Sequence, residues 1–152
     1  MPRQLDDATD TLLASMLVAD GRATLKTLAE ATGLSVSAVQ ARVRRLETDG
    51  VIRGYVAQID PEALGLPLAA FISLTPLDPR QDYEIPDLLA DFSEIESCHS
   101  VAGDASIVLF VRVASPAALE TLIREVRKRA NVATRTTVVL QTCFERQARP
   151  PS

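Results

Sequence analysis

Three arginines lie close together in the stretch GLSVSAVQARVRRLE at residues 33–47, at positions 42, 44 and 45. The chain of 152 residues is acidic, with a formal net charge of −4, so this cluster of positive charge runs against the overall balance. Guanidinium groups bind phosphates and the acceptor edge of guanine, and a glutamine such as Gln40 can make paired hydrogen bonds with adenine. These residue types favour an interaction with a nucleic acid.

A helix must present this cluster. Gly33 suits the end of a preceding helix and Ser35 suits the start of the next one. Apolar residues then recur at helical steps, which predicts a buried face made of Val36, Val39, Val43 and Leu46. The outward face would carry small and hydrogen-bonding residues beside the arginines: Ser37, Ala38, Gln40, Ala41, Arg44 and Arg45.

Two shorter helices are expected before it, the first capped by Asp6 or Asp7 and the second by Thr24. Two helices joined through a glycine turn form a helix-turn-helix candidate. The alternative is an ordinary solvated helix, in which Arg44 pairs with Glu47 and Arg45 with Asp49. The glycine turn and the small outward residues favour binding to DNA.

The apolar spacing changes after Gly50. Residues 51–59 predict a short hairpin or one long strand. Residues 60–67 contain Pro and Gly and are typical of a hinge between two domains. The second half predicts strands at 68–77, 96–103, 106–114 and 134–144, and helices at 85–95 and after Ser115-Pro116. This β-α-β-β-α-β order is that of a ferredoxin-like unit. We therefore expect an α+β protein with domains at residues 1–60 and 61–152.

Some apolar residues of the second half exceed what one small domain can bury. We expect part of this set to form a dimer surface: Phe71, Ile107, Leu109, Phe110 and Val139.

The chain resembles the Lrp/AsnC family of bacterial transcriptional regulators along nearly its whole length. The most specific segments are GLSVSAVQARVRRLETDGVI, IDPEALG and VAGDASIVLFVRV. The resemblance implies an N-terminal winged helix-turn-helix that binds double-stranded DNA and a C-terminal ferredoxin-like domain that dimerises through its sheet. It also implies assembly of the homodimer into octamers, and an amino-acid effector bound between C-terminal domains.

By position, the resemblance implies a recognition helix at residues 35–48. The candidate DNA contacts are Ser35, Ser37, Ala38, Gln40, Arg42, Arg44 and Arg45, with Arg53 in the wing reaching a backbone phosphate. We expect Arg45→Ala to weaken DNA binding and to reduce its dependence on salt.

The implied effector region combines a loop with the last strand. Its candidate residues are Ser100, Ala102, Gly103, Asp104, Ser106, Thr134 and Thr136. Gly103 would let backbone N–H groups approach a carboxylate, and Asp104 could face an ammonium group. The chain departs from the family pattern at Ala105 and Ser106, where members commonly carry an aromatic residue and an aspartate. From the residues alone, Gly103-Asp104 also suits a two-residue hairpin turn.

Several other kinds of site are disfavoured. Cys98 and His99 are adjacent on a predicted strand and would point to opposite faces. His99 is the only histidine, so one chain cannot form a multi-histidine metal site, and no catalytic residue or cofactor is expected. No apolar run approaches the roughly 20 residues needed to span a membrane, and the N-terminus lacks a signal-peptide core. We expect a cytoplasmic protein.

Two rival functions stay open. The first is an amino-acid-binding or metabolic regulatory protein that does not bind DNA directly. The second is an enzyme, which ranks last because no titratable groups converge in the sequence.

Overall fold

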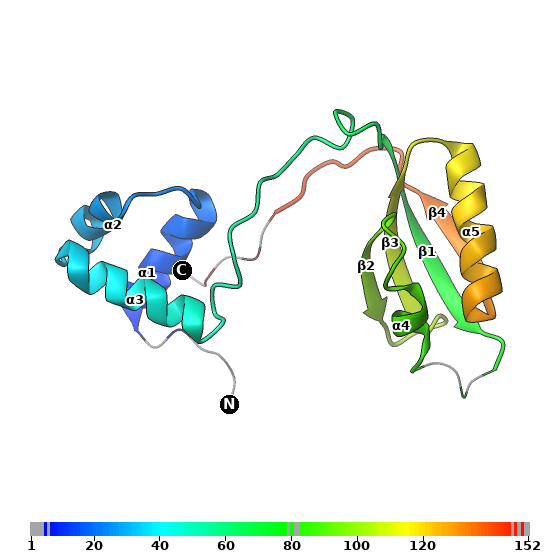
Figure 1. The fold of residues 1–152 in the computed structure, drawn as a ribbon, viewed down its shortest axis with the longest axis horizontal. Coiled ribbons are helices and arrows are strands. Elements are labelled where there is room, and N and C mark those ends of the chain that lie inside the picture. Colours follow the sequence, from blue (N-terminus) through cyan, green and yellow to red (C-terminus); the bar gives the residue numbers. More distant parts are fainter. Residues whose placement is uncertain are drawn as a thin grey trace. The chain divides into compact units, whose positions relative to one another are not determined.

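The computed structural model describes residues 5, 7–78, 80, 83–146, 148 and 150. The described residues fall into two compact units (Figure 1). One contains the residues through Gln58 together with those from Phe144 onward, and the other is Ile59–Cys143. The predicted domain limits at 1–60 and 61–152 stay a prediction.

Three helices make up the ordered part of the first unit: α1 (Ala8–Ala19), α2 (Leu25–Thr32) and α3 (Val36–Thr48). Each helix starts with a side-chain cap that accepts a hydrogen bond from a backbone N–H of the first turn. The caps are Asp7, Thr24 and Ser35, as predicted, while Asp6 lies outside the described residues. The capping distances are 2.8, 3.1 and 3.2 Å.

The turn between α2 and α3 depends on Gly33, whose φ of 69° lies in the left-handed region. Beyond this turn, α3 packs Val39 against Leu13 of α1 and Leu28 of α2, and all three side chains are buried. Val36 was predicted on the same buried face but is 46% exposed. It is the first residue of α3, so its side chain lies beyond the end of this small core.

The segment after α3 differs from the prediction. Residues 51–59, which were expected to form a short hairpin or a long strand, are all described and form neither. A strand requires a hydrogen-bonded neighbour, and alternation of apolar residues alone does not supply one.

The second unit contains a four-stranded antiparallel sheet. Its elements in chain order are β1 (Leu68–Pro76), α4 (Ile85–Leu89), β2 (Ile95–Ser100), β3 (Ile107–Val113), α5 (Pro116–Ala130) and β4 (Val132–Val138). The strand order is β2-β3-β1-β4, so the two central strands are β3 and β1. This arrangement confirms the predicted ferredoxin-like β-α-β-β-α-β unit. No helix of the described residues is long and apolar enough to span a membrane.

The strand expected at 96–103 is β2 and ends at Ser100, and the predicted limits differ most for α4 and β4. The helix expected at 85–95 ends at Leu89, where the Phe92 N–H bonds back to the Leu89 carbonyl at 3.2 Å and closes a tight turn. The strand expected at 134–144 runs instead from Val132 to Val138. It starts early because Asn131, with φ 50°, ends α5 and redirects the chain within one residue.

The two faces of the sheet have different environments. One face packs against α4 and α5, and buries Ile72, Leu109 and Val111 completely. Ile107 and Leu109, which were candidates for a dimer surface, belong to this core, since they alternate with outward residues along β3. The opposite face carries Phe71, which is 44% exposed and lies opposite Phe110 in the strand register.

Candidate nucleic-acid interface and effector region

The start of α3 is an exposed, polar and capped helix end. Ser35 Oγ accepts the Ala38 N–H at 3.2 Å and lies 3.1 Å from Ser37 Oγ. Both serines and Gln40 are exposed, while Ala38 is half-buried. A helix N-terminus also carries partial positive charge from its unsatisfied N–H groups. This end of α3 can therefore meet a polyanion with small side chains and free hydrogen-bonding groups.

The arginines of α3 do not share one environment. Arg42 Nη1 donates to Asp7 Oδ2 at 2.7 Å and to Asp10 Oδ1 at 2.9 Å. Arg45 donates to the other oxygen of Asp10, whose side chain is fully buried. Both guanidinium groups thus tie α3 to α1. They reach solvent only in part, with 32% of the Arg42 side chain and 44% of the Arg45 side chain exposed.

The pairing shifts the pKa of both partners in the expected directions. The Asp10 backbone N–H, followed by the Arg42 guanidinium, holds the pKa of the Asp7 carboxyl below its usual range. Hydrogen bonds from Arg42 to Asp7 and Asp10 raise the pKa of the guanidinium. Asp10 was not singled out from the sequence, because the only sign of its burial there is its helical spacing from the apolar residues of α1.

Arg44 and Arg53 are exposed and, among the described residues, neither pairs with a carboxylate. The Arg44–Glu47 surface pair considered from the sequence is therefore not formed. Glu47 instead accepts a hydrogen bond from the Tyr55 hydroxyl at 3.0 Å. Arg44 remains available to a phosphate, since no carboxylate of the described chain neutralises it.

Tyr55 connects the segment after α3 to the helices. Its ring lies against Gly21, where an added Cβ would come 3.4 Å from Tyr55 Cδ1. Burial, reinforced by the Glu47 carboxylate, raises the pKa of Tyr55 to about 12. This anchor was also missed from the sequence, which showed Tyr55 only as part of an expected strand.

The loop between β2 and β3 carries four of the seven predicted effector residues, and a fifth, Ser100, is the last residue of β2. The Val101 N–H donates to the Ser106 carbonyl at 2.9 Å, and the Ser106 N–H donates to the Leu74 carbonyl at 3.1 Å. Neither Gly103 nor Asp104 has a positive φ, which excludes the two-residue hairpin turn considered from the sequence. No described atom lies within 4 Å of a Cβ built at Gly103, so nothing in its own chain requires glycine there.

The two remaining effector candidates lie on another part of the sheet. Thr134 pairs with Leu74 and Thr136 with Ile72, both of which belong to the core beneath the helices. Residues directly opposite in an antiparallel pair share a face, so both threonines lie on the helix side of β4. Thr134 Oγ1 accepts a hydrogen bond from Arg127 Nε of α5 at 2.7 Å. Within one unit, β1 lies between these threonines and the loop, whose Ser106 N–H donates to the carbonyl of Leu74, the residue that pairs with Thr134.

The cysteine nucleophile and the metal site, which the sequence disfavoured, find no support among the described residues. Burial raises the pKa of the Cys98 thiol, which is the opposite of what a thiolate nucleophile needs. Among the described residues, no group of three or more His, Cys, Asp and Glu side chains could hold a metal ion.

Two family models match the chain. A winged helix-turn-helix DNA-binding model covers residues 6–53, and an Lrp/AsnC ligand binding domain model covers residues 69–149. The first match contains α1 to α3, and the second contains the sheet from Ala69 onward with α4 and α5.

Curated relatives agree with these models. An HTH-type transcriptional regulator LrpA from Mycobacterium tuberculosis is 56% identical over 144 residues, which is 95% of each chain. An HTH-type transcriptional regulator FL11 from Pyrococcus horikoshii is 33% identical over 90% of each chain.

Solved structures share the fold. A feast or famine regulatory protein from M. tuberculosis complexed with L-methionine superposes with a TM-score of 0.92 and 54% identity. The match covers 97% of this chain and all of that one. AsnC from E. coli superposes with a TM-score of 0.90 and 25% identity over 97% of this chain and all of that one.

Proposed function

Because the chain belongs to the Lrp/AsnC family of transcriptional regulators, we propose that it reads pseudo-palindromic promoter DNA as a symmetric dimer under the control of an amino acid. The observation that carries this proposal is the exposed, capped start of α3, together with Arg44 further along the helix, which is exposed and has no carboxylate partner among the described residues. Because the chain as a whole is acidic, a local surface with positive charge and exposed hydrogen-bonding groups favours binding of a polyanion there.

In the proposed complex, the first turns of α3 enter the major groove. Ser37, Ala38 and Gln40 meet base edges, since small residues let the helix backbone approach closely and Gln40 can pair with adenine. Arg44, and Arg53 beyond the helix, neutralise phosphates. Arg42 and Arg45 act mainly by holding α3 against α1, with the exposed part of Arg45 still able to touch the backbone.

We propose that the open face of the sheet forms the dimer surface. Phe71 and Phe110 lie with ring centroids 5.0 Å apart, and Arg112 lies over the Phe110 ring at 5.4 Å. A partly exposed aromatic pair on a sheet face is a typical interface core. Pairing of two copies would place two α3 helices on half-sites related by twofold symmetry. Octamers built from such dimers are part of the same proposal.

The effector is proposed to be an amino acid bound near the Val101–Ser106 loop and completed by a second copy. Open space at Gly103 lets a ligand carboxylate reach backbone N–H groups, and exposed Asp104 can face the ammonium. The solved relative with L-methionine makes methionine the first candidate. Control of DNA binding then requires that the amino acid bind one quaternary arrangement better than another.

DNA binding is tested by fluorescence anisotropy on a duplex from the region upstream of the protein's own gene. We expect affinity to fall steeply as salt rises from about 50 to 200 mM, because each neutralised phosphate releases counterions. Gln40→Ala should reduce the preference for this duplex over a scrambled one. Lys26→Ala, on the exposed side of α2, is the matched control and should change neither quantity. Absence of any salt-sensitive binding by the folded protein would contradict the proposal.

A further inference from the structure

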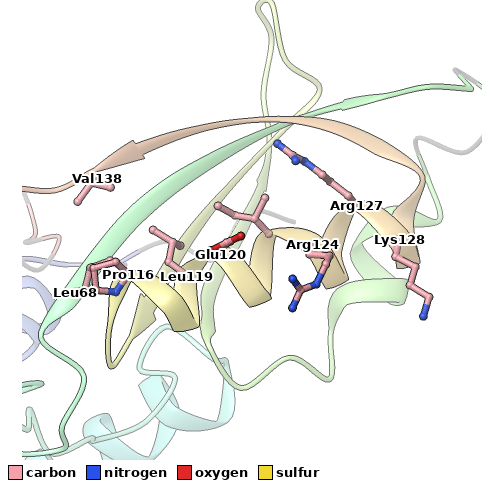
Figure 2. Close-up of a pocket in the computed structure, with 9 residues that line it drawn as sticks. Leu68, Pro116, Leu119, Glu120, Arg124, Arg127, Lys128 and Val138 are labelled. Atoms are coloured by element: carbon pink, nitrogen blue, oxygen red, sulfur yellow. The ribbon is translucent and has the colours of Figure 1, made fainter.

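A groove of about 790 Å³ runs along α5 on the helix side of the sheet (Figure 2). Its apolar floor is formed by Leu68 of β1, Leu119 and Ile123 of α5, and Val138 of β4. Volumes of roughly 300–1,000 Å³ are typical of small-molecule sites. The groove lies entirely within the second unit, and no element of the proposed DNA-binding surface contributes to it.

The rim of the groove is basic. Arg124, Arg127 and Lys128 line it, and among the described residues none of them pairs with a carboxylate. Arg127 is held in place by its Nε, which donates to Thr134 Oγ1 at 2.7 Å. One acidic residue, Glu120, also lines the groove and lies one helical turn before Arg124.

The fourth basic residue of this helix end provides a contrast. Arg129 does not line the groove, forms an ion pair with Asp91 and lies over the Phe92 ring at 4.8 Å. The negative end of the helix dipole favours basic residues in the last turn, and that accounts for some of this charge. The helix dipole does not explain why Arg124, Arg127 and Lys128 have no carboxylate partner among the described residues while the neighbouring Arg129 has one.

We propose that this groove binds an amphipathic monocarboxylate, with its apolar chain on the floor and its carboxylate at Arg127. Arg124, which points away from Arg127 (Figure 2), and Lys128 add positive charge to the rim. Guanidinium groups match carboxylates in charge and geometry. Duplex DNA fits the groove less well, because a phosphodiester backbone offers nothing to the apolar floor. A free amino acid also fits less well, because its ammonium would lie near three cations and only one carboxylate, that of Glu120.

This site is separate from the effector loop. The loop joins β2 to β3, whereas the groove lies along β4, at the opposite edge of the sheet. Thr134 was predicted to belong to the effector region together with the loop. In the structure its hydroxyl accepts a hydrogen bond from Arg127, which lines the groove.

The test uses the full-length protein, octanoate as the probe and no DNA. Calorimetry should show saturable binding of octanoate and at least tenfold weaker binding of octanamide, which lacks the charge. 2-Aminooctanoate, which adds the ammonium, should also bind at least tenfold more weakly. Arg127→Gln should weaken octanoate binding by about tenfold or more, and Arg124→Gln should weaken it less. Arg129→Gln, on the same helix, is the matched control and should leave octanoate binding unchanged.

Backbone amide NMR then locates the probe. We expect octanoate to shift resonances of α5 around Ile123–Lys128 and of Val138, but not those of the Val101–Ser106 loop. Equal binding of octanoate and octanamide, an equal loss in Arg129→Gln, or shifts confined to the loop would each overturn the site. Because DNA is absent, these outcomes are independent of whether the protein binds its operator.

Discussion

The carboxylate of Asp10 is fully buried in α1 and lies 2.9 Å from the guanidinium of Arg42 on α3. Arg45 donates to the same carboxylate, so one acidic side chain holds two successive turns of the proposed recognition helix. A buried charge is tolerated only when it is paired and hydrogen-bonded. The orientation of α3 against α1 is therefore coupled to the integrity of this cluster.

Removing the buried charge should destabilise the helical unit. Asp10→Ala leaves two guanidinium groups without their shared partner and is expected to cost about 3 kcal/mol of unfolding free energy. Chemical denaturation followed by circular dichroism measures the loss. Asp20→Ala, an exposed residue at the end of α1, is the control and should change stability far less. Equal stabilities of the two variants would show that the cluster does not hold α3.

The arginines of α3 should separate into two classes in DNA binding. Arg44→Ala should weaken binding and lower the slope of log affinity against log salt by about 1, because one phosphate contact is lost. Arg42→Ala should instead lower stability, with a smaller change in slope, since Asp7 and Asp10 already compensate its charge. Anisotropy over a salt series distinguishes them, and an unchanged slope for Arg44→Ala would rule out its phosphate contact.

Tyr55 should give the protein a stability term at alkaline pH. Its raised pKa, about 12 against an ordinary 10.0, means that the folded state favours the neutral phenol. The resulting stabilisation is complete below pH 10 and is lost as pH rises toward 12. Spectrophotometric titration should show one phenol ionising near pH 12. That step should disappear in Tyr55→Phe and move down in Glu47→Gln. Absence of any step near pH 12 in the natural protein would refute the contact.

Substitution of two glycines by alanine should affect stability differently. Gly33→Ala forces a Cβ into left-handed backbone with no other contact, and should cost about 1 kcal/mol of stability. Gly103→Ala meets neither positive φ nor a neighbouring atom, so thermal stability should stay within about 0.5 kcal/mol. Calorimetry with L-methionine should nevertheless show weaker binding by Gly103→Ala. Unaltered methionine affinity would remove Gly103 from the proposed effector site.

A charge on the open sheet face should prevent dimerisation. Phe71→Glu places a carboxylate beside Phe110 on the proposed dimer surface, where burial without a partner is costly. Light scattering should show a monomer for this variant and a dimer or larger assembly for the natural protein. Tyr83→Glu, at an exposed position outside the sheet, is the control and should not alter the assembly. Retention of the assembly by Phe71→Glu would place the interface elsewhere.

Much of the local structure could be predicted from short-range patterns. The caps at Asp7, Thr24 and Ser35, the turn at Gly33 and the start of α5 at Pro116 all depend on residues within one helical turn of each other. The order of the elements then predicts the ferredoxin-like topology, because few arrangements join such elements without crossings. Limits such as the end of α4 were less predictable, since a turn at Phe92 competes with an unbroken helical pattern.

The sequence by itself determined that this chain has an exposed, polar start to a capped helix and a sheet with two helices on one face. Only the tertiary structure decided which charges are free. Arg42, Arg44 and Arg45 are the same residue type within four positions. Two of them meet a carboxylate 32 and 35 residues away, whereas Arg44 meets none in the part of the chain that the structure describes. In the same way, the strand order places β1 between Thr134 and the loop, and Thr134 bonds to Arg127. Ion pairs and register depend on long-range packing, which residue type and local spacing do not encode.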